Sequence, residues 1–452
     1  MKKLLTHIGK VTPSPFGEGK PARTAKQAGG EVKKNISHLP KLYAKAWLIS
    51  LIFIFQFSTF NFCKAQFTVL HYFNDSTGSY PAGSLIFSGQ NLYGLTLGGA
   101  YNFGCIFKMD TNGSGYSDIF DFNNTDGAYP YGSLILFDNK LFGMTSEGGM
   151  YDSGCIFKIE TNGTGYKDLF DFNTKFGANP KGTLLSVGSR LYGMTFDGGL
   201  HDSGCIFSID TNGSGYKKLF DFTKLKGTNP YGSLTISGNL LFGMTDSGGK
   251  DNYGVVFSID TNSDNYKVLF NFNGSPNGVY PHGSLILDGN ELYGMTQEGG
   301  VNYWGNIFKI DTNGNNYKNL FDFNFTNGAE PYGDLTLMGN RLFGMVFEGE
   351  TNNFGDIFSI DTNANGFNDL IVFDRTNGSY PYGSLIPIGK VLYGMTSEGG
   401  LHNNGEIFRI DTTYIAGTKD IIENAGITVL FPNPNSGIFT FEIQTEKSSP
   451  NQ

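Results

Sequence analysis

This sequence of 452 residues is poor in charged side chains, which make up 16% of it, and has little of the alanine, leucine and glutamate that favour helices. A mainly helical fold is therefore disfavoured. Glycine, with 64 residues, and aromatic side chains, at 15%, are abundant instead. Many short strands joined by tight turns have this composition, so we expect an all-β protein.

Basic residues are scarce beyond the N-terminus. The first 65 residues hold 11 of the 32 Lys and Arg residues and 2 of the 41 Asp and Glu residues, so the remainder has a formal charge of 21 − 39 = −18. Binding to nucleic acid needs clustered Lys and Arg to release the counterions of the phosphates. We therefore expect no nucleic-acid partner.

The motifs of common enzymes are also missing. There is no Gly-x-Ser-x-Gly, no His-Glu-x-x-His and no phosphate-binding loop, and the six histidines are scattered. Three of the four cysteines, Cys105, Cys155 and Cys205, stand at one equivalent position in successive repeats, too far apart for disulfides. We expect buried free thiols, with a metal or redox role as the alternative. We expect no cofactor, and we favour a protein that is not an enzyme.

The N-terminal region has the pattern of an export signal. Residues 41–65 combine basic residues, an apolar core from Ala46 to Phe62 and a small residue, Ala65, before a possible cleavage site. This order is typical of a secretory signal peptide, with a membrane anchor as the alternative. Residues 1–40 form a basic extension without periodicity, which we interpret as a misassigned start. We expect a secreted protein or one on the outer cell surface.

Seven prolines mark an internal repeat, at steps of 49 to 51 residues: Pro81, Pro130, Pro180, Pro230, Pro281, Pro331 and Pro381. The second copy predicts four strands, over residues 132–137, 141–145, 154–159 and 166–172. Such a unit can bury its apolar faces only against its neighbours. A glycine recurs inside the second strand of every copy, here Gly143, and we attribute it to tight packing of the units.

The two ends of the repeat region indicate a closed ring. The seventh copy ends at Asp411 without a fourth strand, and residues 67–73 align with the fourth strand of the other copies. A strand supplied by the start of the mature chain would remove the exposed sheet edges. We therefore predict a monomeric, all-β, seven-bladed β-propeller of four-stranded blades over residues 66–411, closed by the N-terminal strand 67–73.

The repeat resembles known families. Its Gly-Gly doublet and its Phe-Lys-Ile-Asp type of third strand resemble kelch repeats in layout. The whole unit, with Leu-Tyr-Gly-Met-Thr, Gly-Gly, Gly-x-Ile-Phe-x-Ile-Asp and Leu-Phe-Asp-Phe, is similar to the GloVer tandem-repeat family of exported bacterial proteins. This resemblance covers residues 67–411 and implies no particular reaction.

The C-terminal tail follows a linker over residues 412–425. Residues 426–452 contain an apolar strand, Pro432-Asn433-Pro434 and a second strand-like segment, and they resemble the first part of the C-terminal sorting domain of the type IX secretion system. The resemblance implies that this partial domain contacts the secretion machinery. An unrelated strand-turn-strand tail is the alternative.

Candidate ligand residues lie where the copies differ. In a propeller, the loops around the repeated proline and before the Gly-Gly doublet lie on one face, around the mouth of the central channel. Aromatic rings cover the apolar side of a sugar and carboxylates accept its hydroxyl protons, so we expect a glycan or another surface macromolecule as partner. The candidates are Tyr131, Lys181, Tyr231, His282, Tyr332, Tyr382, Glu147, Asp197, Glu298, Glu348 and Glu398.

Other interpretations of these residues are open. Tyrosine can pack on the proline loops, and the carboxylates can accept N–H groups of their own turns. A carbohydrate-active enzyme, either a glycosidase or a polysaccharide lyase, could use carboxylate pairs across the channel, and a structural or adhesive surface protein is a third possibility. A turn with calcium-loop spacing is degraded in other copies, so we predict a hairpin turn and no metal site there: Asp110, Asn112, Ser114 and Asp121.

Overall fold

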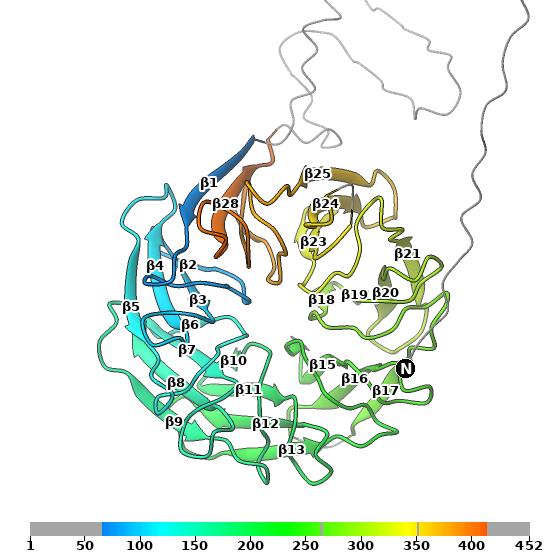
Figure 1. Cartoon of the computed structure of the whole chain (residues 1–452). Coiled ribbons are helices and arrows are strands. Elements are labelled where there is room, and N and C mark those ends of the chain that lie inside the picture. The colour runs from blue at the N-terminus through cyan, green and yellow to red at the C-terminus, as the bar shows by residue number, and fades with distance from the viewer. Residues whose placement is uncertain (1–65, 263–264, 350–351, 414–452) are drawn as a thin grey trace, which may run out of the picture. The chain divides into compact units, whose positions relative to one another are not determined.

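The computed structural model describes residues 66–262, 265–349 and 352–413 (Figure 1). Within these ranges the chain forms twenty-eight strands and no helix, and so no helix that could cross a bilayer. The predicted extension 1–40, the signal peptide 41–65, most of the linker and the tail 426–452 lie outside the described residues.

The strands form seven antiparallel sheets of four strands each, which are the blades. Blade 1 contains β2 (Ile86–Ser88), β3 (Asn91–Thr96), β4 (Cys105–Asp110) and β5 (Ser117–Asp121). Blade 2 contains β6 (Ile135–Phe137), β7 (Lys140–Thr145), β8 (Cys155–Glu160) and β9 (Lys167–Asp171). Blade 3 contains β10 (Leu185–Val187), β11 (Arg190–Thr195), β12 (Cys205–Asp210) and β13 (Lys217–Asp221). Blade 4 contains β14 (Thr235–Ser237), β15 (Leu240–Thr245), β16 (Val255–Asp260) and β17 (Lys267–Asn271). Blade 5 contains β18 (Ile286–Asp288), β19 (Glu291–Thr296), β20 (Asn306–Asp311) and β21 (Lys318–Asp322).

The last two blades complete the circle. Blade 6 contains β22 (Thr336–Met338), β23 (Arg341–Val346), β24 (Asp356–Asp361) and β25 (Asn368–Val372). Blade 7 contains β26 (Ile386–Ile388), β27 (Val391–Thr396), β28 (Glu406–Asp411) and β1 (Gln66–Tyr72). Strand β1 pairs antiparallel with β28, so the start of the propeller supplies the outer strand of blade 7. The predicted seven-bladed propeller closed by this strand is confirmed, with the strand beginning and ending one residue earlier than predicted.

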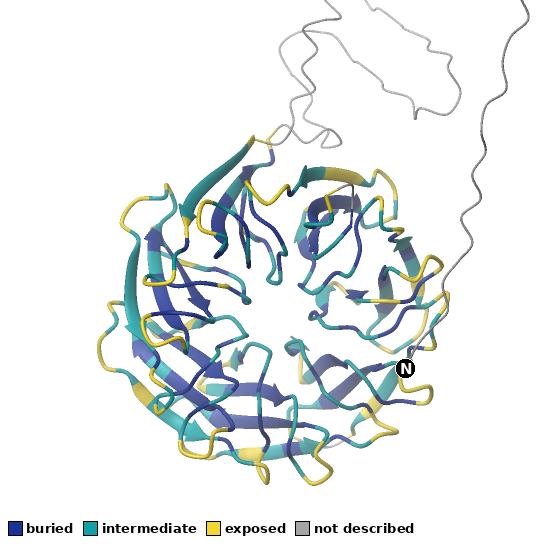
Figure 2. Ribbon diagram, viewed as in Figure 1, coloured by how far each residue is buried: buried dark blue, intermediate teal, exposed yellow. Residues whose placement is uncertain are grey.

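The apolar cores lie between blades. The two middle strands of each blade are the most buried, and exposed residues gather in the loops (Figure 2). Each of the seven hydrophobic clusters combines residues from two neighbouring blades; one of them packs Phe73, Tyr393 and Ile407 of blade 7 against Leu85 and Phe107 of blade 1. A blade therefore buries both faces only because the ring is complete.

The glycine inside the second strand of each blade has a different cause from the one predicted. Gly143 lies directly opposite Phe157 on the neighbouring strand β8 of its own blade. A Cβ at Gly143 would clash with the Phe157 ring and come close to Leu134, also of blade 2. The glycine makes room for this buried phenylalanine within the blade, so the interpretation as a close approach between blades was wrong.

The two ends of the propeller lie on one face. Gln66 begins β1 beside Asp411, the last residue of β28, and the other six blades make their turn between third and fourth strand at this end. The loops that enter each blade and those that join its second and third strands lie at the opposite end. The face with the candidate ligand residues is thus opposite the chain ends of the propeller.

Candidate ligand site at the channel mouth

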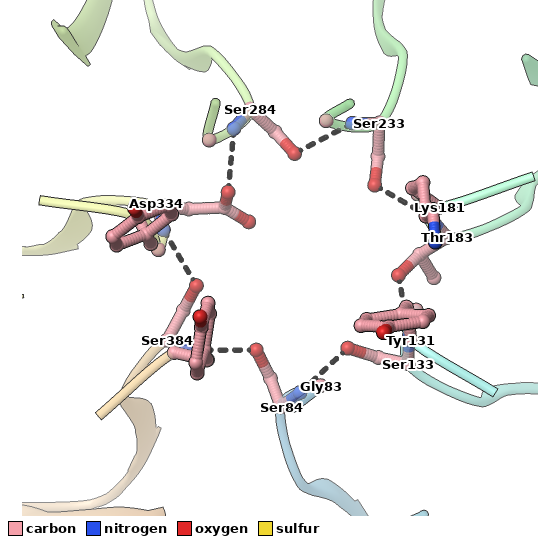
Figure 3. Close-up of a pocket in the computed structure, with 18 of the residues that line it drawn as sticks. Gly83, Ser84, Tyr131, Ser133, Lys181, Thr183, Ser233, Ser284, Asp334 and Ser384 are labelled. Carbon is pink, nitrogen blue, oxygen red and sulfur yellow. Dashed lines mark hydrogen bonds between the residues drawn. The ribbon is translucent and has the colours of Figure 1, made fainter. Parts of the chain in front are cut away.

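A ring of hydrogen bonds joins the seven blades around the axis (Figure 3). Three residues after each repeated proline, a backbone N–H donates to the side-chain oxygen of the equivalent residue in the next blade, over 2.5–2.8 Å. The final bond runs from Ser384 to Ser84 and closes the ring across 300 residues. The members are Ser84, Ser133, Thr183, Ser233, Ser284, Asp334 and Ser384.

This ring narrows the channel. The glycine before each member lies against the glycine of the next blade, and a Cβ on Gly132, for example, would clash with the carbonyl oxygen of Gly182. The cavity enclosed here is only about 60 Å³. Since small-molecule pockets are usually several hundred Å³, a ligand would lie across the mouth and not inside the channel.

The residues that follow the repeated prolines surround this cavity, and we call them the channel mouth: Ala82, Tyr131, Lys181, Tyr231, His282, Tyr332 and Tyr382. All seven are partly buried. The structure therefore brings together the six candidates that we predicted at this position, which come from blades 2 to 7.

The mouth side chains contact one another in two groups. The rings of Tyr231, His282, Tyr332 and Tyr382 form a continuous series with centroids 4.7–5.0 Å apart. In the other group, Lys181 Nζ lies 3.7 Å from the centroid of the Tyr131 ring, within cation–π range. Ala82 stands between the two groups with only a methyl side chain.

The backbone two residues before each mouth residue, just ahead of the repeated proline, has a strained conformation. The residue preceding the repeated proline has φ between 52° and 57° in all seven copies. Asparagine tolerates this left-handed conformation, whereas tyrosine and glutamate pay about 1 kcal/mol or more for it. Five copies retain a bulky side chain despite this cost: Tyr80, Tyr129, Tyr280, Glu330 and Tyr380.

The five predicted carboxylates are not among the described residues that line the cavity, and their backbones hold them in the loops around it. Glu147, for example, exchanges two backbone hydrogen bonds with Ala128, in the loop that enters the same blade. The next N–H of this turn, from Gly148, is bonded by Asp152 at 3.1 Å, so the Glu147 carboxylate is not needed to cap it. The same backbone pairing holds Asp197, Glu298, Glu348 and Glu398.

Burial and mutual repulsion raise the pKa of several of these groups. Burial raises the pKa of Glu298, and the neighbouring Glu330 and Asp246 raise it further, while His282 opposes them. Burial and Glu330 raise the pKa of Glu348 in the same direction. Around Lys181 the balance is the reverse, because burial lowers the pKa of the amine and the charges of Glu147 and Asp197 oppose this.

The mouth tyrosines remain protonated donors at neutral pH. Burial raises the pKa of Tyr231, and the nearby hydroxyls of Tyr131, Tyr382 and Tyr332 raise it further. Burial and Tyr382 likewise raise the pKa of Tyr332, whose hydroxyl lies 2.6 Å from Gln297 Nε2. Four phenolic hydroxyls from different blades thus converge on one small area.

Sequence reasoning missed several residues of this region. Asp246 binds His282 Nε2 through Oδ1 at 2.8 Å, and Phe347 packs against the rings of Tyr332 and Tyr382. Asp334 supplies the carboxylate in the ring of hydrogen bonds, and burial raises its pKa. The recurrence of Gly followed by Ser, Thr or Asp after each proline loop was the signal for this ring.

The turn with calcium-loop spacing, for which we predicted no metal site, is held by hydrogen bonds among its own side chains. Ser114 Oγ donates to Asp110 Oδ2 at 2.9 Å and to Asn112 Oδ1 at 2.7 Å, within the turn. Asp121 pairs with Cys105, at the other end of β4 from Asp110. The four residues with calcium-loop spacing are therefore not gathered around one point.

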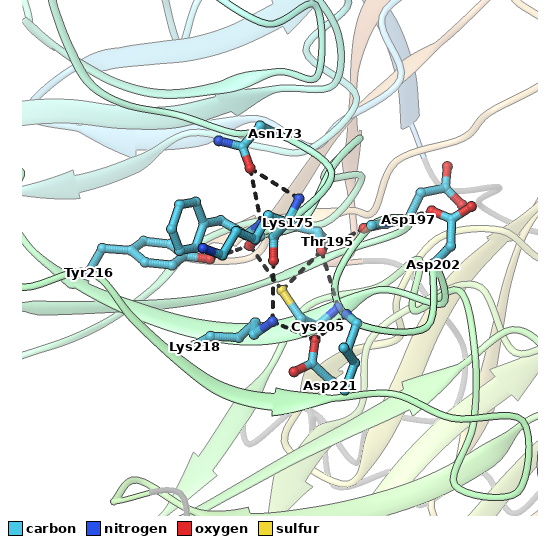
Figure 4. Close-up of polar contacts among 12 residues, drawn as sticks. Asn173, Lys175, Thr195, Asp197, Asp202, Cys205, Tyr216, Lys218 and Asp221 are labelled. Atoms are coloured by element: carbon cyan, nitrogen blue, oxygen red, sulfur yellow. Dashed lines mark hydrogen bonds and ion pairs between the residues drawn. The ribbon is translucent and has the colours of Figure 1, made fainter.

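The cysteines occupy a repeated polar position at the start of the third strand of blades 1 to 3. Cys105, Cys155 and Cys205 are buried and free, as predicted. Figure 4 shows the contacts of Cys205: its thiol donates to the carbonyl of Phe176 at 3.3 Å and lies 3.3 Å from the hydroxyl of Thr195. Its cross-strand partner Asp221 accepts the N–H of Leu200 at 2.8 Å.

A second cavity, of about 690 Å³, lies at the edge of blade 7 and was not predicted. Its lining is formed by Tyr72 and by residues 374–376 and 400–403. Tyr72 here takes the place that Asp221 has in blade 3, and this substitution was the available signal in the sequence.

Comparison with known proteins identifies the repeat. A family model described as the Gloeobacter/Verrucomicrobia repeat matches residues 53–151, 98–290 and 262–424, which together cover most of the chain. No curated protein sequence matches it.

Several solved structures are similar to this chain at low sequence identity. A Mycobacterium tuberculosis puromycin-hydrolyzing peptidase gives a TM-score of 0.51 at 12% identity, over 77% of this chain and 55% of that chain. An oligogalacturonate lyase in complex with manganese gives 0.46 at 12% identity, over 77% and 96%, and the GH74 enzyme of Niastella koreensis gives 0.43 at 15%, over 67% and 46%. This chain spans about half of the peptidase and of the GH74 enzyme. At 12% identity, the similarity to the peptidase concerns the fold alone.

Proposed function

This chain belongs to the Gloeobacter/Verrucomicrobia repeat family, and we propose that it is an exported or cell-surface binding module whose channel mouth holds a glycan. The convergence of four tyrosine hydroxyls beside carboxylates is the observation that carries the proposal. Phenolic and carboxylate groups together can donate to and accept from the hydroxyls of a sugar, and the rings can cover its apolar side.

The shape of the mouth favours binding over enclosure. Because the ring of hydrogen bonds leaves a cavity of only about 60 Å³, a sugar would rest on the tyrosines as the end or a segment of a longer chain. The strained residues before the prolines support a role for the mouth, since the left-handed backbone there would be less costly with asparagine or glycine.

Export and attachment are parts of the same proposal. Residues 41–65 would direct secretion, and residues 426–452 would engage the type IX machinery, within an architecture laid out like kelch repeats. The ends of the propeller leave from the face opposite the mouth, so a protein held by its C-terminal tail could keep the mouth accessible.

A glycan array with the purified full-length protein tests the proposal. We expect binding to one class of glycan, and an affinity at least tenfold lower after Tyr131, Tyr231, Tyr332 and Tyr382 are all changed to Phe, because each lost hydrogen bond is worth about 1 kcal/mol. Phenylalanine retains the packing, so a matched unfolding curve separates loss of binding from loss of fold. Unchanged binding after the same four residues are changed to Ala would refute the assignment of this face.

The same samples distinguish the other functions. Release of reducing ends or unsaturated ends from a bound polysaccharide would indicate a glycosidase or a lyase in place of a binding module. A blank array combined with capture of one defined surface protein would indicate an adhesive or structural role.

A further inference from the structure

The channel mouth already holds one ammonium group, that of Lys181. Its Nζ lies 3.7 Å from the centroid of the Tyr131 ring, and the negative charge of Glu147 acts on it. Burial lowers the pKa of this amine, whereas the charges of Glu147 and Asp197 and the quadrupole of the ring favour its ammonium form. Tyr131 and Glu147 come from blade 2 and Lys181 from blade 3.

The same arrangement recurs between blades 7 and 1 without the lysine. Tyr382 and Glu398 are the blade 7 equivalents of Tyr131 and Glu147, and Ala82 of blade 1 is the equivalent of Lys181. The backbones match, because the bond from Ser384 to Ser84 repeats the bond from Ser133 to Thr183. We call this part of the mouth, with Ala82, Tyr382 and the neighbouring Glu398, the Ala82 notch.

The notch offers an aromatic face and negative charge. The Tyr382 ring contacts the rings of Tyr332 and Phe347, with centroids 5.0 and 4.8 Å away, and its other neighbour around the mouth is Ala82. The charges of Glu398 and Glu330 both act on Tyr382. Lys181 is the only lysine or arginine among the described residues that line the mouth, and it belongs to the other group of side chains.

We propose that the Ala82 notch binds a protonated amine of the ligand, so that the glycan recognised is one with free amino groups. This inference rests on the proposed glycan-binding function and narrows its substrate class. A uronic acid would be repelled by Glu398 and Glu330, and an N-acetylated sugar would bring no charge to the Tyr382 face. A cation–π contact together with a nearby carboxylate is expected to change affinity by about tenfold or more.

The test compares the β-1,4-linked glucosamine hexasaccharide with its N-acetylated counterpart by calorimetry. We expect the full-length protein to bind the free-amine form at least tenfold more tightly. Ala82→Lys should remove this preference, since its own ammonium would occupy the notch as Lys181 does beside Tyr131. Glu398→Gln should weaken binding of the free-amine form without affecting the N-acetylated one.

A charge-matched control separates the notch from general attraction to an acidic protein. Gln90→Lys adds the same charge in an exposed turn on the opposite face and should leave the preference unchanged. Equal binding of the two hexasaccharides, or a preference that survives Ala82→Lys, would overturn the inference. If a different glycan bound and the change of the four tyrosines weakened that binding, the proposed glycan-binding function would be supported and the preference for amino groups refuted. If no glycan bound, both the proposed function and this inference would be refuted.

Discussion

Blade 2 and blade 7 have the same four-stranded geometry, but only blade 2 is built from consecutive strands. At the start of its third strand, Cys155 pairs with Asp171 of the fourth, and Asp171 accepts the N–H of Met150 at 2.7 Å. At the same place in blade 7, Glu406 pairs with Tyr72. The acidic residue of this pair is on the fourth strand in blade 2 and on the third strand in blade 7.

This exchange changes the environment of the carboxyl group. Glu406 is fully buried, and neither of its carboxyl oxygens has a hydrogen-bond partner among the described residues. Burial, with a smaller contribution from the charge of Asp374, raises the pKa of Glu406 to about 8. The closing blade therefore has a buried polar group without a partner in the described part of the chain, whereas blades 1 to 5 satisfy the corresponding group through the loop between their second and third strands.

Blade 6 shows the same exchange, so it is not caused by the closing strand itself. Here Asp356 stands on the third strand and Val372 on the fourth. Blades 1 to 5 keep an aspartate or asparagine on the fourth strand, where its Oδ1 accepts a loop N–H at 2.7–2.9 Å: Asp121, Asp171, Asp221, Asn271 and Asp322. The exchange thus distinguishes the last two blades from the first five.

Among the changes that test the difference between blades 2 and 7, removal of residues 66–73 should have the largest effect on stability. It takes away β1, exposes the edge of β28 and deletes Phe73, whose loss alone should cost about 3–5 kcal/mol. We expect loss of cooperative unfolding or aggregation, measured by denaturant titration and light scattering. In a control chain, the same eight residues follow Asp411 through a copy of the blade 2 turn 161–165, which should restore stability by making blade 7 continuous.

Replacement of Glu406 by Gln should have the next largest effect, and it should be stabilising. The unfolded chain loses this proton near pH 4.5, whereas the folded protein keeps it until about pH 8, so the stability of the wild type falls as pH rises between these values. The variant lacks this decline and should gain up to a few kcal/mol at pH 8 and little at pH 4.5.

Denaturant unfolding of both proteins at pH 5, 6.5 and 8 measures this gain. Asp171→Asn provides the matched change in blade 2, where the bond from Met150 keeps an acceptor, as with Asn271 in blade 4, but loses its charge assistance at a cost of about 1 kcal/mol. A gain for Glu406→Gln that is the same at all three pH values would contradict the role of ionisation.

Replacement of Cys155 by Val should have the smallest effect. Val255 fills the equivalent position of blade 4, so we expect a change in unfolding free energy below about 1 kcal/mol. Burial raises the pKa of the Cys155 thiol to about 12, so a thiol reagent should label it in the wild type only on unfolding. Rapid labelling of the native protein would show instead that blade 2 opens locally.

The repeat, the blade count and the closure by the N-terminal strand could be predicted from the sequence, because each depends on local pattern and on contacts with the next copy. Strand bounds were less accurate: residues 132–134 were expected in a strand, but Ser133 bonds to the neighbouring blade, Gly132 lies against Gly182 of that blade, and β6 begins at Ile135. The candidate mouth residues were found by the same pattern, since variation at one position of a repeat is visible without coordinates.

What only the tertiary structure decided depends on distances between blades. The ring from Ser84 to Ser384, the contact of Lys181 with Tyr131 and the missing counterpart at Ala82 arise from curvature that brings residues 50 or 300 positions apart together. The burial of Glu406 is decided in the same way, because its surroundings combine the first strand of the propeller with the last. Sequence therefore determined the unit and its number, and the closed ring determined which side chains meet.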